Sequence, residues 1–283
     1  MKLGTQAHKE LFCRSFLDSY QEYNPETLPW PDLDPVSLER LRSIPFWKEA
    51  LYTEKKAGIM VSAFARTIED PLIKEAITLQ GQEETRHGRL IQFLINRYEI
   101  PISQPENIEL PLDIERAFTD FGFEECLDSF FAFGLFEIAR LAKYLPQAFF
   151  DIFDPIMNEE ARHIVFFVNW ISYLQIERGR GWAPLRSAHA LYHYGSALTG
   201  LVKTFAGAGE REEQAFAATG ARTFMDDLTA EMFFSLCIQE NQKRMQQFDP
   251  ELLQPRLLPR LSSVALSVVK LLPKKNSLSV QTN

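Results

Sequence analysis

Two stretches of nearly identical spelling decide the fold: QEETRH at residues 82–87 and NEEARH at residues 158–163. Both end in Glu-Glu-x-Arg-His, and they contain two of the five histidines in the chain. Residues i and i+3 of a helix point to the same side, so each stretch presents a carboxylate beside an imidazole. A single pair of this kind is usually a surface contact. Two copies favour a shared metal site, because one group of helical bundles binds two metal ions through two single glutamates and two Glu-x-x-His pairs.

The two single glutamates follow from how the helices pair. If an antiparallel pair turns near residue 70, the partner of Glu84 lies about as far before the turn as Glu84 lies after it, which selects Glu54 over Glu49. A break between the third and fourth helices, at residues 145–155, selects Glu137, which lies within about two turns of it on one side as Glu160 does on the other; Glu125 is about three turns too distant. The predicted metal ligands are Glu54, Glu84, His87, Glu137, Glu160 and His163.

The charge of this set favours metal binding over simple packing. Four carboxylates turned into a bundle core are prohibitively costly unless they are protonated or paired. Two divalent cations cancel all four negative charges. Carboxylates and imidazoles without thiolates suit iron or manganese.

Composition excludes several other classes of protein. The chain has 283 residues, 46% of them hydrophobic, and a formal net charge of −8, which argues against a nucleic-acid partner. Its three cysteines form no C-x-x-C pair, so they predict neither a disulfide framework nor a thiolate metal site. We find no signal-peptide pattern and no stretch apolar enough to span a bilayer. The expected location is the cytoplasm, with at most peripheral membrane contact.

Helical periodicity without any alternating strand pattern predicts an all-α fold. Asp70-Pro71 and Asp154-Pro155 are signals for a helix start, and Pro146 predicts a break. The predicted helices cover 45–67, 70–97, 123–144, 154–178, 184–205 and 210–248, with one short helix after Asp34-Pro35. The predicted organisation is an N-terminal arm (1–44), a di-metal four-helix bundle (45–178), additional helices packed on the bundle (179–250) and a basic, leucine-rich tail (251–283).

The order Glu, Glu-Glu-x-Arg-His, Glu, Glu-Glu-x-Arg-His resembles the ferritin-like di-iron carboxylate superfamily. The spelling is similar to the DExRH strings of bacterial multicomponent monooxygenase hydroxylases, and QEETRHGRLIQFL resembles the EENRHGDLL stretch of acyl carrier protein desaturases. The resemblance covers about residues 45–175. It implies a ferritin-like four-helix bundle with additional C-terminal helices. It also implies two iron ions as cofactor, with manganese and iron, or manganese alone, as alternatives.

The resemblance also implies roles for individual glutamates. Glu84 and Glu160 correspond to bridging or chelating ligands. Glu83 and Glu159 stand where many relatives have an Asp that hydrogen-bonds a ligand histidine. That role and a solvated surface glutamate remain equal alternatives, because the side chain is one methylene longer.

Departures from the patterns of individual families in this superfamily reduce the number of reaction types that we expect. The radical tyrosine of ribonucleotide reductase small subunits would stand at Ile91, and the rubredoxin cysteines of rubrerythrin are absent. The threonine that monooxygenases and desaturases place one turn after the third ligand would fall near Arg140 and Leu141. Ferritin ordinarily lacks the second histidine. An O₂-using oxygenase or oxidase remains.

Small residues near the predicted ligands have two open interpretations. Ala57, Gly58 and Gly134 either leave room for O₂ and a substrate or allow close packing of helices. In the first case phenylalanines would line the cavity and favour an apolar substrate. These phenylalanines are Phe130, Phe131, Phe133, Phe136 and Phe166.

Two further signals stay open. His189 and His193 are four residues apart. They are either an extra ligand or proton route, or ordinary helix residues, and we favour the second interpretation by about three to one. Residues 251–283 carry five Lys and Arg against Glu251 alone, interleaved with leucine and valine. This tail suits either an anionic membrane surface or docking onto the acidic bundle.

The predicted function is an O₂-activating di-iron oxygenase or oxidase that acts on a small, largely apolar or lipid-like organic molecule. No flavin, haem or iron–sulfur signature is present, so the electrons come from an external donor such as a ferredoxin or a reductase, or from the substrate. The alternatives are a ferroxidase or peroxide-scavenging protein and a non-catalytic binding protein. A homodimer is compatible with each.

Overall fold

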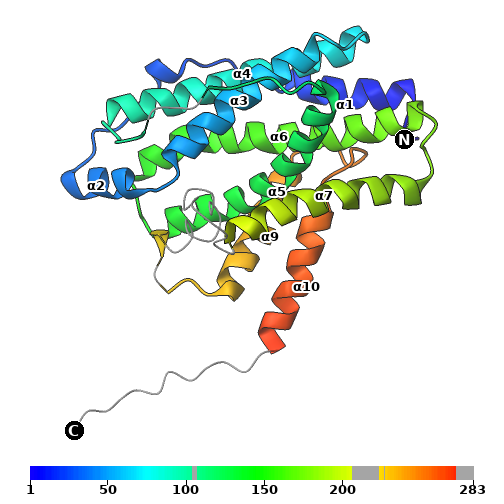
Figure 1. Ribbon diagram of the computed structural model, residues 1–283. Helices are drawn as coiled ribbons and strands as arrows, with labels where there is room; N and C mark the ends of the chain where they lie inside the picture. The colour runs from blue at the N-terminus through cyan, green and yellow to red at the C-terminus, as the bar shows by residue number, and fades with distance from the viewer. Residues whose placement is uncertain (104–106, 206–222, 226, 272–283) are drawn as a thin grey trace.

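The computed structural model describes residues 1–103, 107–205, 223–225 and 227–271. All regular structure in these ranges is helical, which confirms the predicted all-α class. The longest helices are α3 (Trp47–Ala65), α4 (Pro71–Arg97), α5 (Ile114–Leu141) and α6 (Gln147–Glu177), shown in Figure 1. Within the described ranges, none of the helices combines the length and the apolar character that crossing a bilayer requires.

The turn before α4 forms as its sequence predicts. The side chain of Asp70 accepts hydrogen bonds from the backbone N–H groups of Leu72 and Ile73, and Pro71 takes the first helical position. This cap holds α3 and α4 as an antiparallel pair. The pairing faces Glu54 toward Glu84.

The N-terminal residues form more helix than predicted. The short helix after Asp34-Pro35 is α2 (Pro35–Ser43), but α1 (Gln6–Asp18) was not predicted. A short 3₁₀ helix, η1 (Pro25–Thr27), lies between them. α1 packs against α6 and α4, and Lys9 forms an ion pair with Asp70. The N-terminal segment therefore covers the two helices that carry the repeated stretches.

The predicted break at Pro146 is confirmed, but the predicted helix start at Asp154-Pro155 is wrong. α6 runs without interruption through Pro155, and α5 begins at Ile114, nine residues before its predicted start at 123. A proline inside a helix costs about 3 kcal/mol. The flanking Ile152 and Ile156 are both buried, and burial of such side chains offsets this cost.

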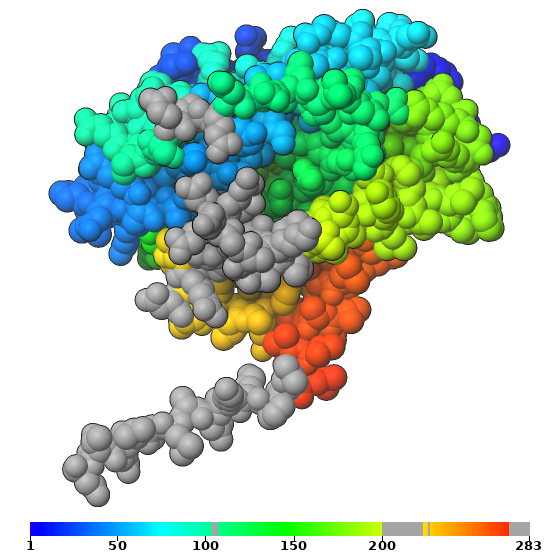
Figure 2. Space-filling view, in the orientation of Figure 1, coloured from blue at the N-terminus to red at the C-terminus, as the bar shows by residue number. Residues whose placement is uncertain are grey.

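Within the described residues, three helices follow the bundle. They are α7 (Ala183–Phe205), α9 (Ala230–Met245) and α10 (Leu257–Leu271). α7 and α9 pack against α5, and α10 packs against α9 and projects from the body of the protein (Figures 1 and 2). Part of the helix predicted over 210–248 lies outside the described residues; the rest corresponds to α9.

The apolar core consists of two main clusters that leave a gap for the repeated stretches. In α4, Ile77 belongs to the first cluster and Leu90 to the second. In α6, Ile164 belongs to the first and Ile156 to the second. Both Glu-Glu-x-Arg-His stretches therefore lie between the clusters, where a polar group is costly unless it has a partner.

Candidate metal centre

Carboxylates and imidazoles from α3, α4 and α6 converge in the bundle interior. Ligand atoms of Glu54, Glu84, His87 and Glu160 all lie within 4.8 Å of one another. His163 joins them, because its Nδ1 lies 3.1 Å from Oε1 of Glu84. The structure thus brings together five of the six predicted ligands.

The sixth predicted ligand, Glu137, does not lie at the cluster, and Glu125 of the same helix lies there instead. The carboxylate of Glu137 pairs with Arg140 one turn further along α5. Glu125 instead faces Glu160, Glu84 and Glu54, and its carboxyl hydrogen-bonds to Glu160. Twelve residues separate the two glutamates on one helix, a rise of about 18 Å, so they cannot both reach the cluster.

The error comes from the position of the turn. The chain reverses between Leu141 and Gln147, whereas the prediction placed the break over residues 145–155 and began the fourth helix at Asp154-Pro155. From a turn centred at Tyr144, Glu160 lies 16 residues downstream and Glu125 lies 19 residues upstream. The two distances nearly match, as an antiparallel pair requires.

The correction also changes one departure from the resembled families. One turn after Glu125 the chain has Ser129, a buried residue with a hydroxyl group. The positions compared with that threonine in the sequence, Arg140 and Leu141, were counted from Glu137, which does not lie at the cluster. A hydroxyl therefore stands one turn after the glutamate at the cluster, on a serine rather than a threonine.

The first glutamate of each stretch braces the histidine of the other. The Nε2 of His87 lies 2.7 Å from Oε2 of Glu159, and the Nε2 of His163 lies 2.9 Å from Oε2 of Glu83. A carboxylate only accepts, so each Nε2–H donates. Glu83 and Glu159 are buried, and the alternative of a solvated surface glutamate is wrong for both.

The arginine of each stretch completes this reciprocal arrangement. Arg86 Nη2 donates to Oε1 of Glu159 at 2.6 Å, and Arg162 pairs with Glu83 in the same way. The Arg86 guanidinium also lies 4.0 Å from the ring centre of Tyr23, whose hydroxyl donates to Glu159. Each bracing glutamate is thus neutralised by a buried arginine, which leaves the charge of the inner carboxylates uncompensated.

The inner nitrogens of both histidines are buried without a hydrogen-bond partner. These atoms are Nδ1 of His87 and Nδ1 of His163. When the ring is neutral with its proton on Nε2, Nδ1 carries a lone pair that faces carboxylate oxygens and cannot accept a hydrogen bond from them. A buried polar atom without a partner is costly, and metal binding is the usual role of a neutral imidazole so placed. The donor set therefore fits a metal ion.

Glu84 and Glu160 each present one oxygen to each histidine. Glu160 Oε1 lies 3.0 Å from Nδ1 of His87, and its Oε2 lies 3.4 Å from Nδ1 of His163. Glu84 Oε2 lies 3.8 Å from Nδ1 of His87, while its Oε1 faces His163. Each of these two carboxylates therefore lies between the two imidazoles.

The pKa values reflect the crowded charges. Burial raises the pKa of Glu54 to about 7 against the opposing effect of His87. Burial raises the pKa of Glu125 well above its usual value, and the neighbouring carboxylates raise it further. Burial alone would lower the pKa of His87, but Glu159, Glu160 and Glu54 raise it well above its usual value. Protons thus balance charge that a divalent cation would otherwise balance.

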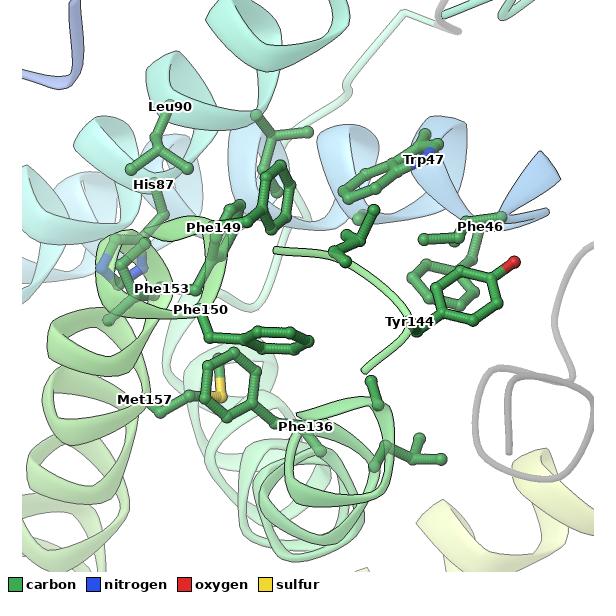
Figure 3. Close-up of a pocket in the computed structure, with 18 of the residues that line it drawn as sticks. Phe46, Trp47, His87, Leu90, Phe136, Tyr144, Phe149, Phe150, Phe153 and Met157 are labelled. Carbon is green, nitrogen blue, oxygen red and sulfur yellow. The ribbon is translucent and has the colours of Figure 1, made fainter. Parts of the chain in front are cut away.

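An apolar cavity of about 200 Å³ meets the cluster at Glu54 and His87. Figure 3 shows His87 at one end and Phe46 and Tyr144 at the other. Aromatic and aliphatic side chains from α3, α4, α5 and α6 form most of its wall. The indole N–H of Trp47 donates a hydrogen bond of 2.8 Å to the backbone carbonyl of Leu41, so it adds no free polar group to the cavity wall.

The residues predicted to line a substrate cavity do not line this one. A Cβ atom on Gly58 would lie 2.6 Å from Thr85 Oγ1, and one on Gly134 would meet Cys237, so both glycines allow close helix packing. Ala57 is buried outside the cavity lining, and Phe133 is fully buried in the core with Arg244 over its ring. Of the phenylalanines predicted for the wall, Phe136 contributes.

His189 and His193 lie away from the cluster, between α7 and α5. Nδ1 of His193 lies 2.6 Å from Asp120, and its ring stacks on Phe123. They do not join the other ligand atoms. The structural interpretation, a contact between helices, fits this placement.

Comparison with models of protein families gives no match, and neither does comparison with curated proteins or with solved structures. The cluster of glutamates and histidines in an all-helical protein is compatible with a di-iron site.

Proposed function

We propose that the protein binds two iron ions, or manganese in place of one or both, and uses O₂ to oxidise a small, largely apolar organic molecule. One observation carries the proposal: the apolar cavity ends on Glu54 and His87, two members of the cluster. A purely structural metal site needs no such space beside it.

The donor geometry supports two ions rather than one. Glu84 and Glu160 would bridge, since each faces both histidines. Glu54 and His87 would complete one ion's ligands, and Glu125 and His163 those of the other. Four carboxylates then balance two divalent charges, and neutral imidazoles suit iron and manganese.

The residues around the ions would do four things. Glu83 and Glu159 hold each imidazole with its proton on Nε2, which keeps Nδ1 free to bind. Arg86 and Arg162 each form an ion pair with one of these two glutamates. The apolar wall excludes water and orients the substrate toward Glu54 and His87. Iron bound there would supply the electrons for O₂ reduction, replenished by a ferredoxin, a reductase or the substrate.

The cavity limits the substrate by size and polarity. Its volume of about 200 Å³ is somewhat larger than a cavity of about 150 Å³ that accommodates benzene. A single small ring or a short alkyl chain fits this space. A charged group would be costly there, because few polar atoms could pair with it.

The rival role, oxidation of iron itself or scavenging of peroxide, needs a polar path to the cluster. A polar cleft beside α1 and α6 reaches Glu159 and Arg162. These residues brace the histidines, and none of the four ligand carboxylates lines that cleft. The cavity that does reach a ligand is apolar, which favours the oxygenase or oxidase.

Anaerobic loading with ferrous iron, followed by O₂ exposure and Mössbauer spectroscopy, tests the metal chemistry. The expected result is two iron ions per chain that become oxidised as a coupled pair. A protein that binds neither iron nor manganese would refute the proposal and favour a non-catalytic role.

A cavity variant tests the substrate. Ala139 lines the cavity, and Ala139→Leu should abolish binding of a small apolar probe such as toluene without changing the metal content. The matched control is Ala142→Leu, at the end of α5 and outside the lining. Equal toluene binding by the wild type and Ala139→Leu would contradict the assignment of this cavity as the substrate site.

A further inference from the structure

The outer face of α10 carries an unpartnered apolar stripe. Leu261, Val264, Val268 and Leu271 are 48%, 63%, 53% and 84% exposed. Their spacing of three, four and three residues places them along one side of the helix. The opposite side packs on α9, and Leu258 and Ser262 are the buried residues of α10. Figure 1 shows α10 projecting from the body, so the stripe is open to its surroundings.

A groove of about 630 Å³ lies beside this stripe, between α9 and α10. Arg256 and Arg260 line it together with the amide side chains of Gln242 and Gln246 and the hydroxyl of Ser263. Val264, a member of the stripe, lies at the same groove. The groove therefore offers hydrogen-bond donors directly next to an exposed apolar surface.

The charge of this region is opposite to that of the whole protein. No acidic residue is among the described residues that line the groove, and none of the described carboxylates forms an ion pair with Arg256 or Arg260. The helix itself carries Arg260 and Lys270 and no acid. The chain as a whole has a formal net charge of −8. Two arginines without acid partners in one groove are suited to an anion, and phosphate accepts hydrogen bonds from guanidinium groups in a fixed geometry.

We propose that α10 and the groove between α9 and α10 bind the surface of an anionic phospholipid membrane. Arg256 and Arg260 hold the lipid phosphate, while Leu261, Val264 and Val268 enter the boundary between head groups and acyl chains. A second copy of the protein is a poorer occupant. Pairing two α10 helices along this stripe would bring cations together without an acid to balance them.

Co-sedimentation of the full chain with lipid vesicles tests this proposal. Binding is expected to vesicles that contain phosphatidylglycerol and not to pure phosphatidylcholine, and it should weaken as salt is added. Each cation near such a surface contributes roughly fivefold to the affinity, so Arg256→Gln with Arg260→Gln should weaken binding about 30-fold. Val264→Ser with Val268→Ser should weaken it at least about tenfold through loss of apolar burial.

The matched control is Arg66→Gln with Lys74→Gln, which removes the same charge from two exposed positions, one directly after α3 and one on α4. This pair should bind vesicles as the wild type does, and circular dichroism should show equal helix content for all variants. Equal weakening by the control pair would reduce the effect to net charge and overturn the proposal. Equal binding to neutral vesicles, or a stripe that instead forms a dimer in sedimentation analysis, would overturn it too. The measurement needs no metal, so its outcome is independent of the proposed oxidation chemistry.

Discussion

Replacing Glu125 and Glu137 by glutamine, one at a time, discriminates sharply between the two candidates for the sixth ligand. Glu125→Gln keeps the size of the side chain but removes a carboxylate that faces three other acids. Glu137→Gln removes the partner of Arg140, an i,i+3 pair worth about 0.2–0.5 kcal/mol. The first should therefore change metal binding, and the second should not.

The expected size of the effect follows from the number of ions. An ion at 100 times its Kd stabilises the folded protein by about 2.7 kcal/mol, so two sites give about 5 kcal/mol. A chain of this size gains roughly 2–3 °C in Tm per kcal/mol. Metal should raise the Tm of the wild type and of Glu137→Gln by about 10–15 °C, and that of Glu125→Gln by about half as much.

Two measurements check this prediction together. Elemental analysis should find two iron ions per chain in the wild type and in Glu137→Gln, and one in Glu125→Gln. Differential scanning fluorimetry, with and without metal, should give the Tm shifts. Without metal, Glu125→Gln should be at least as stable as the wild type, because burial raises the pKa of this carboxyl. Two ions in Glu125→Gln, or one in Glu137→Gln, would show that the reasoning is wrong.

Further predictions concern the braces, the packing and pH. Glu159→Ala leaves Arg86 buried without its acid, so the free energy of unfolding, measured with urea, should fall by about 3–5 kcal/mol. Titration should show that the affinity for metal is about 10–100-fold weaker. Unchanged affinity would contradict the bracing role of Glu159. Gly58→Ala places Cβ 2.6 Å from Thr85 and should destabilise by about 1–3 kcal/mol, whereas Gly88→Ala meets its nearest atom at 3.4 Å and should be tolerated; equal Tm values would refute this difference. The pKa of Glu54 is raised to about 7, so its contribution to the stability of the metal-free protein is complete below about pH 4.5 and lost as pH rises through 7. The Tm of the metal-free protein should therefore fall between pH 5 and 8, and bound metal should reverse this trend because it displaces protons; a metal-free Tm that rises over this range would contradict the assignment.

The repeated stretches were recognisable in the sequence because helical spacing alone turns a carboxylate and an imidazole to one side. Glu54 could be placed by counting from the Asp70-Pro71 turn, since that cap forms as expected. Glu125 could not, because Pro155 resembles a helix start but lies inside α6. The packing of Ile152 and Ile156 overrides this local signal, and such packing is not visible from residue types.

The cavity was the least predictable feature. For Gly58 and Gly134 the sequence left space beside the metals and close helix packing as equal alternatives, and neighbouring helices fill that space. The actual cavity lies between side chains such as Phe149 and Leu90, which also belong to a core cluster. Whether large apolar residues meet or leave a gap depends on the helix positions, so the same composition suits both outcomes.

The reciprocal bond between each glutamate and the opposite histidine has a consequence for how the protein matures. Neither repeat is complete by itself: His87 needs Glu159, and His163 needs Glu83. Sliding α4 past α6 by a single residue would break both contacts at once. These two contacts need no bound ion, so the two helices can dock in the correct register without one.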